Sequence, residues 1–244
     1  MVLTTHSRPT THEGMTGDAV ICCSNTSTGL GLRTLTSSMW NHAGIVVRIN
    51  KDGSISGDHT GELHVLEINT WAREDAVTGE MVLGAGYSRF DWMSERYNIV
   101  AIRPMKSIHR TRRFLSMIPD FVDKHRGVKF TTNAKPFVSA FIGIPLDSDE
   151  IKNLESMFCS EFMAHFYTTC TGISLDEIFG EEGPELPELV IPEDFSYTGS
   201  PNSGLFEPRN VTIYVDHSDI GSVILPIVLF TFIVMCFIWS LLPR

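Results

Sequence analysis

The chain has 244 residues, with 19 Lys and Arg against 29 Asp and Glu, which gives a formal net charge of −10. A content of 43% hydrophobic and 20% charged residues is enough for a sizeable core and excludes wholesale disorder. The acidic balance argues against a protein that wraps a nucleic-acid backbone, so no nucleic-acid partner is expected. Five cysteines, an odd number, argue against a disulfide scaffold.

In chain order, residues 1–16 are rich in Thr and His and predict a flexible leader. A folded domain is expected over residues 17–195, opening with a buried strand at 19–23. Residues 24–38 are rich in Ser, Thr and Gly and predict a loop. Three β-branched runs follow as strand candidates, at residues 43–49, 64–69 and 97–102. This succession is typical of a meander, so the sheet is expected to be antiparallel.

Two helices are expected in the second half of this domain. Residues 111–125 carry apolar side chains at helical spacing, and Pro119 should kink or divide that helix. Residues 158–167 carry a phenylalanine at every fourth position, which predicts one apolar stripe of a helix that Gly172 would end. The predicted fold class is therefore α+β, a small antiparallel sheet packed by helices.

Charge is unevenly distributed along the chain. Residues 103–135 contain nine basic and two acidic side chains, whereas residues 173–208 contain nine acidic and no basic ones. The basic segment is interpreted as the solvent-facing side of a helix or, alternatively, as a face that contacts anionic lipid. Prolines are frequent in the acidic segment beyond residue 180, so it should be mostly extended, and residues 196–219 are predicted to be a stalk.

The C-terminus carries a long apolar run. The 24 residues from Ile220 to Pro243 are uncharged, and about 20 apolar residues are enough for a helix to cross a bilayer. We therefore expect a transmembrane helix over residues 220–242 in contact with the lipid bilayer; the alternative is a buried core helix. Because residues 1–17 do not resemble a secretory signal, this order predicts a tail-anchored, single-pass membrane protein with a cytosolic N-terminal domain.

Three polar residues are candidates for a catalytic site. His42 lies at the mouth of a strand, and Glu67 lies inside an apolar strand, where a buried carboxylate needs a partner. Cys159 lies at the start of a predicted helix, where the helix dipole favours a thiolate. Together they supply a nucleophile, a base and an orienting group. Each also has a simpler interpretation: Cys159 as an inert buried thiol, and His42 as a polar residue on a loop rim.

Other candidate sites are weaker. Cys22 and Cys23 are adjacent in a strand, and a redox sensor built on them would require a strained ring. No spacing of Cys and His predicts a metal site, and there is no glycine-rich phosphate loop, so no cofactor or metal is expected.

Five short motifs occur in order along residues 17–195: Gly17-Asp18, Asn41-His-Ala-Gly-Ile-Val46, Val65-Leu-Glu67, Cys159-Ser-Glu-Phe162 and Ile191-Pro-Glu-Asp-Phe195. This order resembles that of the circularly permuted papain-like thiol hydrolases of the NlpC-type superfamily, in particular the YiiX-like and poxviral branch. In that branch the histidine strand precedes the cysteine helix. The resemblance implies that Cys159 is the nucleophile, His42 the base and Glu67 the third polar member.

The lecithin:retinol acyltransferase-like enzymes of the same superfamily also place a histidine strand before a cysteine helix. Their usual motif is Asn-Cys-Glu-His, whereas this chain has Phe158-Cys-Ser-Glu161. Their third member is often a histidine, for which His64 is an outside candidate. These departures favour the first branch and leave the substrate open.

The resemblance implies a cysteine hydrolase or acyltransferase that acts on an amide or ester bond through a Cys-His-Glu triad. With the predicted anchor, the expected substrate is a lipid or a membrane-proximal acylated protein, and a peptide or isopeptide is the alternative. A different class of function is also left open: a non-catalytic structural or adaptor membrane protein, for example of a large DNA virus particle, that retains the papain-like fold.

Overall fold

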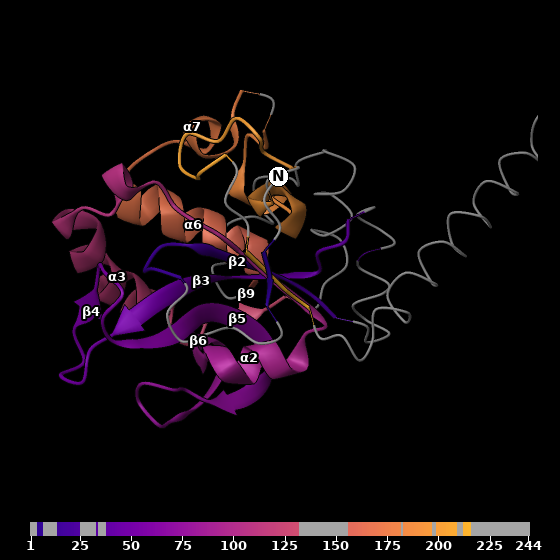
Figure 1. The fold of residues 1–244 in the computed structure, drawn as a ribbon. Coiled ribbons are helices and arrows are strands. Elements are labelled where there is room, and N and C mark those ends of the chain that lie inside the picture. The colour runs from indigo at the N-terminus through magenta and orange to yellow at the C-terminus, as the bar shows by residue number, and fades with distance from the viewer. Residues whose placement is uncertain are drawn as a thin grey trace, which may run out of the picture.

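The computed structural model of the protein describes residues 4–6, 14–24, 33, 38–131, 156–181, 183–196, 199–208 and 212–215. Within these residues, a central sheet carries α3 (Arg112–His125) and α6 (Cys159–Thr171) on one face and α2 (Phe90–Arg96) on the other (Figure 1). The α+β class is thereby confirmed.

The described part of the main sheet has eight strands in the order β1-β10-β7-β2-β3-β5-β6, with β4 paired to β3. Every neighbouring pair is antiparallel except β1 and β10, which run parallel. The strands are β1 Thr4–His6, β2 Ala19–Cys23, β3 His42–Ile49, β4 Ile55–Ser56, β5 Glu62–Glu74, β6 Met81–Arg89, β7 Ile99–Arg103 and β10 Thr212–Val215. A second, two-stranded sheet pairs β8 Lys129–Phe130 with β9 Ser156–Met157.

Local sequence signals set the ends of the two long helices. The Thr111 hydroxyl accepts a hydrogen bond from the Phe114 N–H at 3.1 Å and caps the start of α3, which continues through Pro119 as a single helix. Gly172 ends α6 in the left-handed conformation, with φ of 76°, as its position in the sequence predicts. Shorter helical elements follow at η1 Ser107–His109, α7 Leu175–Phe179, η2 Pro187–Leu189 and η3 Pro192–Phe195.

Alternation along the strands creates two apolar clusters, one on each face of the sheet. Ile21, Ile45 and Leu66 belong to the cluster that includes the apolar side chains of α3 and α6. Val46 and Val65 belong to the second cluster, which includes apolar side chains of α2. Because His42 is an even number of positions from Val46, and Glu67 from Val65, both polar side chains belong to the α2 face of the sheet.

Two segments that were expected outside the domain are part of the sheet. Residues 4–6 of the predicted leader pair with residues 212–215 of the predicted stalk, which in turn pair with β7. Leu205 and Phe206, also within the predicted stalk, are fully buried in the core. The structure therefore extends the folded unit beyond both of the expected boundaries, 17 and 195.

No helix among the described residues is long and apolar enough to cross a membrane. The transmembrane helix predicted over residues 220–242 lies outside the described part of the chain. That prediction rested on hydropathy and segment length, which measure how apolar a segment is and do not establish a spanning helix. The fold class is therefore corrected to α+β, without a transmembrane helix among the described residues. The prediction of a tail-anchored, single-pass membrane protein with a cytosolic N-terminal domain is withdrawn with it.

Candidate active site

The first half of the site is built by neighbouring strands β3 and β5. Their register pairs Ile45 with Leu66, and His42 and Glu67 project from these strands so that His42 Nε2 lies 2.6 Å from Glu67 Oε2. Gly44 lies on β3 two residues after His42, and its missing side chain lets β3 and β5 come this close. A Cβ at Gly44 would lie 2.6 Å from Val65 Cγ1 and 3.3 Å from Glu67 Cβ, so a larger residue would push the two strands apart.

The second half of the site is the start of α6. Cys159 is the first residue of this helix, and its side chain is close enough to the ring of His42 to raise the pKa of the imidazole. The Phe158 N–H just before it donates to Glu161 Oε2 at 3.1 Å, which fixes the first turn. The structure thus brings together Cys159, His42 and Glu67, which are far apart in the sequence; their catalytic roles remain a prediction.

Burial and charge act against each other in this cluster. Burial lowers the pKa of His42, but the hydrogen bonds and charges of Cys159 and Glu67 outweigh it and raise the pKa to about 10. Burial alone would raise the pKa of Glu67, but His42, Arg73 and Ser88 together bring it below its ordinary value. At neutral pH the site therefore holds an imidazolium beside a carboxylate.

Three further residues complete the surroundings of the triad, and none of them was predicted. The ring of Tyr97 stacks on that of His42, with centroids 5.3 Å apart and an interplanar angle of 2°. The Ser88 hydroxyl donates a short hydrogen bond to Glu67 Oε1, and Arg73 Nε lies 3.8 Å from the same oxygen. Nothing in the sequence pattern connects any of these three residues with the triad.

The remaining candidates lie apart from this chemistry. Cys22 and Cys23 are both free and belong to different faces of the sheet: Cys22 Sγ lies 3.9 Å from Met93 Sδ, and Cys23 accepts a hydrogen bond from Arg33. This arrangement does not bring the two thiols together. His64, the outside candidate for the third member, hydrogen-bonds the Glu62 carbonyl group through Nδ1 at 3.1 Å.

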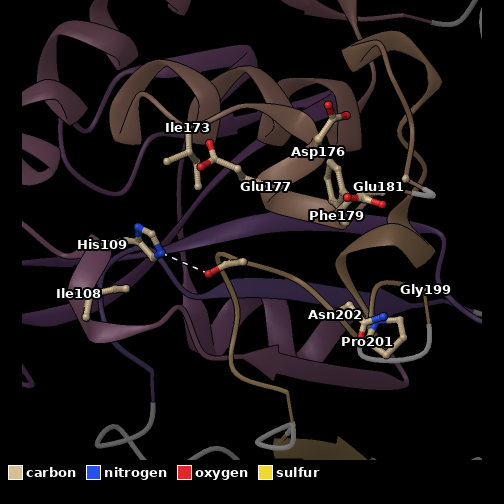
Figure 2. A pocket seen from close by; sticks show the side chains of 13 residues that line it. Ile108, His109, Ile173, Asp176, Glu177, Phe179, Glu181, Gly199, Pro201 and Asn202 are labelled. Carbon is tan, nitrogen blue, oxygen red and sulfur yellow. Dashed lines mark hydrogen bonds between the residues drawn. The ribbon is translucent and has the colours of Figure 1, made fainter.

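Among the described residues, no group of three or more His, Cys, Asp or Glu side chains could hold a metal ion. A cleft of about 700 Å³ lies away from the triad, and none of the three triad residues lines it. Figure 2 shows its lining, with Ile108 and His109 from η1 and acidic side chains of α7 such as Asp176. Ile173, also in the lining, follows α6, whose 13 residues put about 20 Å between the two ends of that helix.

No protein-family model matches the chain, and no curated protein matches it in sequence. Among solved structures, the fold is similar to that of the metalloprotein YiiX from Escherichia coli O157:H7, DUF1105. The two share 14% sequence identity, with a TM-score of 0.42, and the similarity covers 71% of this chain and 86% of that one.

Proposed function

We propose that the protein is a cysteine-dependent hydrolase or acyltransferase that attacks the carbonyl group of an amide or ester. One observation carries the proposal: His42 Nε2 lies 2.6 Å from the Glu67 carboxylate, and the Cys159 side chain is close enough to the same ring to raise its pKa. Each member has the chemistry of its role, since a thiolate is a nucleophile, the His42 imidazolium can donate a proton to a leaving group, and a buried carboxylate fixes the ring.

The contacts define how a proton would move. Glu67 occupies Nε2 of His42, so the other ring nitrogen, Nδ1, is the one left for the Cys159 thiol. The Cys159 thiolate forms a bond to the substrate carbonyl carbon, and the carbonyl π electrons move onto oxygen. When the tetrahedral intermediate collapses, the bond to the leaving amine or alcohol breaks, and His42 supplies the proton that the leaving group takes.

The resulting thioester is resolved by water or by an acceptor amine or alcohol. His42, now neutral, removes a proton from that nucleophile as it attacks, and Cys159 leaves as the thiolate. Backbone N–H groups in the first turn of α6 have no partner within the helix and are the candidate donors to the oxyanion. Whether water or another acceptor resolves the thioester decides between hydrolase and acyltransferase.

The first test measures the rate of alkylation of Cys159 by iodoacetamide in the full chain as a function of pH, with each thiol identified by peptide mass mapping. We expect Cys159 to react at pH 6, where a free thiol of pKa about 8.5 is largely protonated. His42→Ala should lower that rate at least about tenfold, because the neighbouring cation is lost. Cys170 is the internal control, since it lies on the same helix and burial raises its pKa to about 12.

A second measurement uses p-nitrophenyl acetate as an acyl donor. The native chain should release nitrophenol in a burst and carry one acetyl group on Cys159, and Cys159→Ser should abolish the burst. If Cys159 instead reacts no faster than Cys170 and is indifferent to His42→Ala, the fold serves binding and the catalytic proposal is overturned.

A further inference from the structure

A buried arginine lies behind Glu67, on the side opposite to His42. The two carboxylate oxygens of Glu67 have different partners: Oε2 contacts His42, while Oε1 accepts the hydrogen bond from Ser88 Oγ and lies 3.8 Å from Arg73 Nε. Arg73 Nε in turn donates to Ser88 Oγ at 2.8 Å. Ser88 is therefore the link between the guanidinium and the carboxylate.

The guanidinium of Arg73 is fixed in place by the sheet. Its Nη1 donates to the Gly84 carbonyl group at 3.0 Å, and its Nη2 donates to the carbonyl groups of Gly86 at 3.0 Å and Glu67 at 3.2 Å. Its side chain is only 5% exposed. An arginine held by both strands of a pair cannot swing to solvent, so its positive charge stays next to Glu67.

A backbone irregularity puts Arg73 there. The pairing of β5 with β6 shifts register between Asn69 and Arg73, and beyond the shift Arg73 is opposite Val82. Such irregularities re-aim a side chain, and they are frequent beside active sites. In this protein the re-aimed side chain reaches back along β5 to the Glu67 carbonyl group.

We infer that Arg73 and Ser88 are positioning residues for the proposed triad: they keep Glu67 a carboxylate aimed at His42, and through it keep His42 an imidazolium beside Cys159. This inference rests on the proposed function. A carboxylate as buried as Glu67, which is fully inaccessible, would take up a proton without a compensating cation. A neutral Glu67 would no longer hold His42 in its charged form, and Cys159 would lose the cation that favours its thiolate.

The other titratable groups that face the triad do not supply this charge. Burial raises the pKa of Cys22, on β2, and of Tyr97, at the end of α2, well above their ordinary values, so both stay neutral over the working range. Arg73 is thus the cation, among the described residues, that accounts for an ionised Glu67 together with His42.

The test is the pH profile of Cys159 alkylation by iodoacetamide in the full chain. Arg73→Met should lower the rate at pH 6 about tenfold and move the rising part of the profile toward that of a free thiol, while the rate above pH 9 changes little. Arg73→Lys, which keeps the charge without the fork of donors, should recover part of the loss. Thermal unfolding and the protection of Cys170 report whether each variant remains folded.

Ser88 provides a milder pair of variants if Arg73→Met does not fold. Ser88→Ala removes the link and should shift the profile in the same direction by a smaller amount, and Ser88→Thr, which retains the hydroxyl, should restore it. A role that runs through Glu67 also predicts that Arg73→Met has no further effect on the profile once Glu67→Gln is present. If Arg73 acted only through packing, Arg73→Met would change the profile as much in the Glu67→Gln variant as in the native chain.

The outcomes separate this inference from the proposed function. If His42→Ala slows Cys159 at pH 6 but the Arg73 and Ser88 variants keep the native profile, the triad stands and the positioning role is overturned. The same conclusion follows if the effect of Arg73→Met persists with Glu67→Gln. If His42→Ala itself has no effect, the proposed function fails, and the inference fails with it.

Discussion

The imidazole of His42 is held at its edges and on its face. Glu67 contacts one edge of the ring through a hydrogen bond, Cys159 is near enough to raise the pKa of the ring, and Tyr97 lies parallel to its face with the ring centroids 5.3 Å apart. Hydrogen bonds alone leave a ring free to tilt about the line joining its partners. A parallel aromatic neighbour resists this tilt, so Tyr97 has a role in geometry that needs no proton transfer of its own.

Replacing Tyr97 tests that role. Tyr97→Leu should lower the rate of Cys159 alkylation at pH 6 about fivefold, the equivalent of losing a stacking interaction of about 1 kcal/mol. Tyr97→Phe is the matched control, because it keeps the aromatic face and should stay within about twofold of the native rate. Equal rates for the leucine and phenylalanine variants would show that stacking does not orient the ring.

At the scale of the elements, β-branched runs and helical periodicity in the sequence predicted the strands and the helix that carry the triad. The three β-branched runs correspond to β3, the first half of β5 and β7, the buried run at 19–23 corresponds to β2, and the phenylalanine repeat corresponds to α6. His42, Glu67 and Cys159 could therefore be proposed from the order of residues alone. Two of the three side chains share a sheet face because a strand has a period of two.

Irregular elements could not be predicted in the same way. Strand β6 contains Gly84 and Gly86, which weaken a strand signal. Glycine is required at position 84, since its φ is +95° and a Cβ there would overlap the carbonyl oxygen of Val128, the residue just before β8. Arg73 reaches Glu67 only through the register shift in β5, and a hydropathy pattern does not encode that shift.

The start of α6 carries a partly buried carboxylate, Glu161, which gives a prediction for stability. Burial raises the pKa of Glu161 to about 7, more than the Phe158 N–H lowers it, and the charge of Glu188 raises it further. Because this pKa is raised above the unfolded value of 4.5, the stability that it contributes is complete below about pH 4.5 and is lost as pH rises through 7.

Glu161→Gln should therefore stabilise the protein at pH 8 and leave it unchanged at pH 4. The amide keeps an oxygen for the Phe158 N–H and removes the charge, so the gain in the free energy of unfolding at pH 8 should be at most about 3 kcal/mol. Urea unfolding at the two pH values measures it. The same gain at both values would mean that the charge of Glu161 is not the cause.

On the scale of the whole molecule, part of the basic segment 103–135 is internal. Arg103 is fully buried and donates to the carbonyl groups of Ser196 and Ser200, each at 2.6 Å, which attaches the chain after η3 to β7. Arg110 pairs with Asp18 and donates to the Thr16 carbonyl group at 2.9 Å. These two charges hold distant parts of the chain together and do not contribute to an exposed basic face, so the predicted contact with anionic lipid depends on the remaining residues.

The Asp18–Arg110 pair joins the start of β2 to the chain that follows β7. Asp18 also accepts hydrogen bonds from the N–H groups of Met15 at 2.7 Å and Met105 at 2.8 Å. Burial raises its pKa, although Arg110 and these N–H groups oppose the rise. Both side chains of the pair are less than one-tenth exposed, so removing one partner leaves an uncompensated charge in the interior.

Arg110→Met should lower the free energy of unfolding at pH 7 by about 3–5 kcal/mol. The deficit should shrink as pH falls, because a protonated Asp18 no longer needs a cation and its protonation is already favoured by burial. Adding Asp18→Asn to Arg110→Met should recover much of the loss at pH 7, since no buried charge then remains. Urea unfolding of the native chain and of both variants at pH 7 and pH 4.5 measures this. A deficit that is independent of pH and that the double variant does not relieve would show that Arg110 acts through packing.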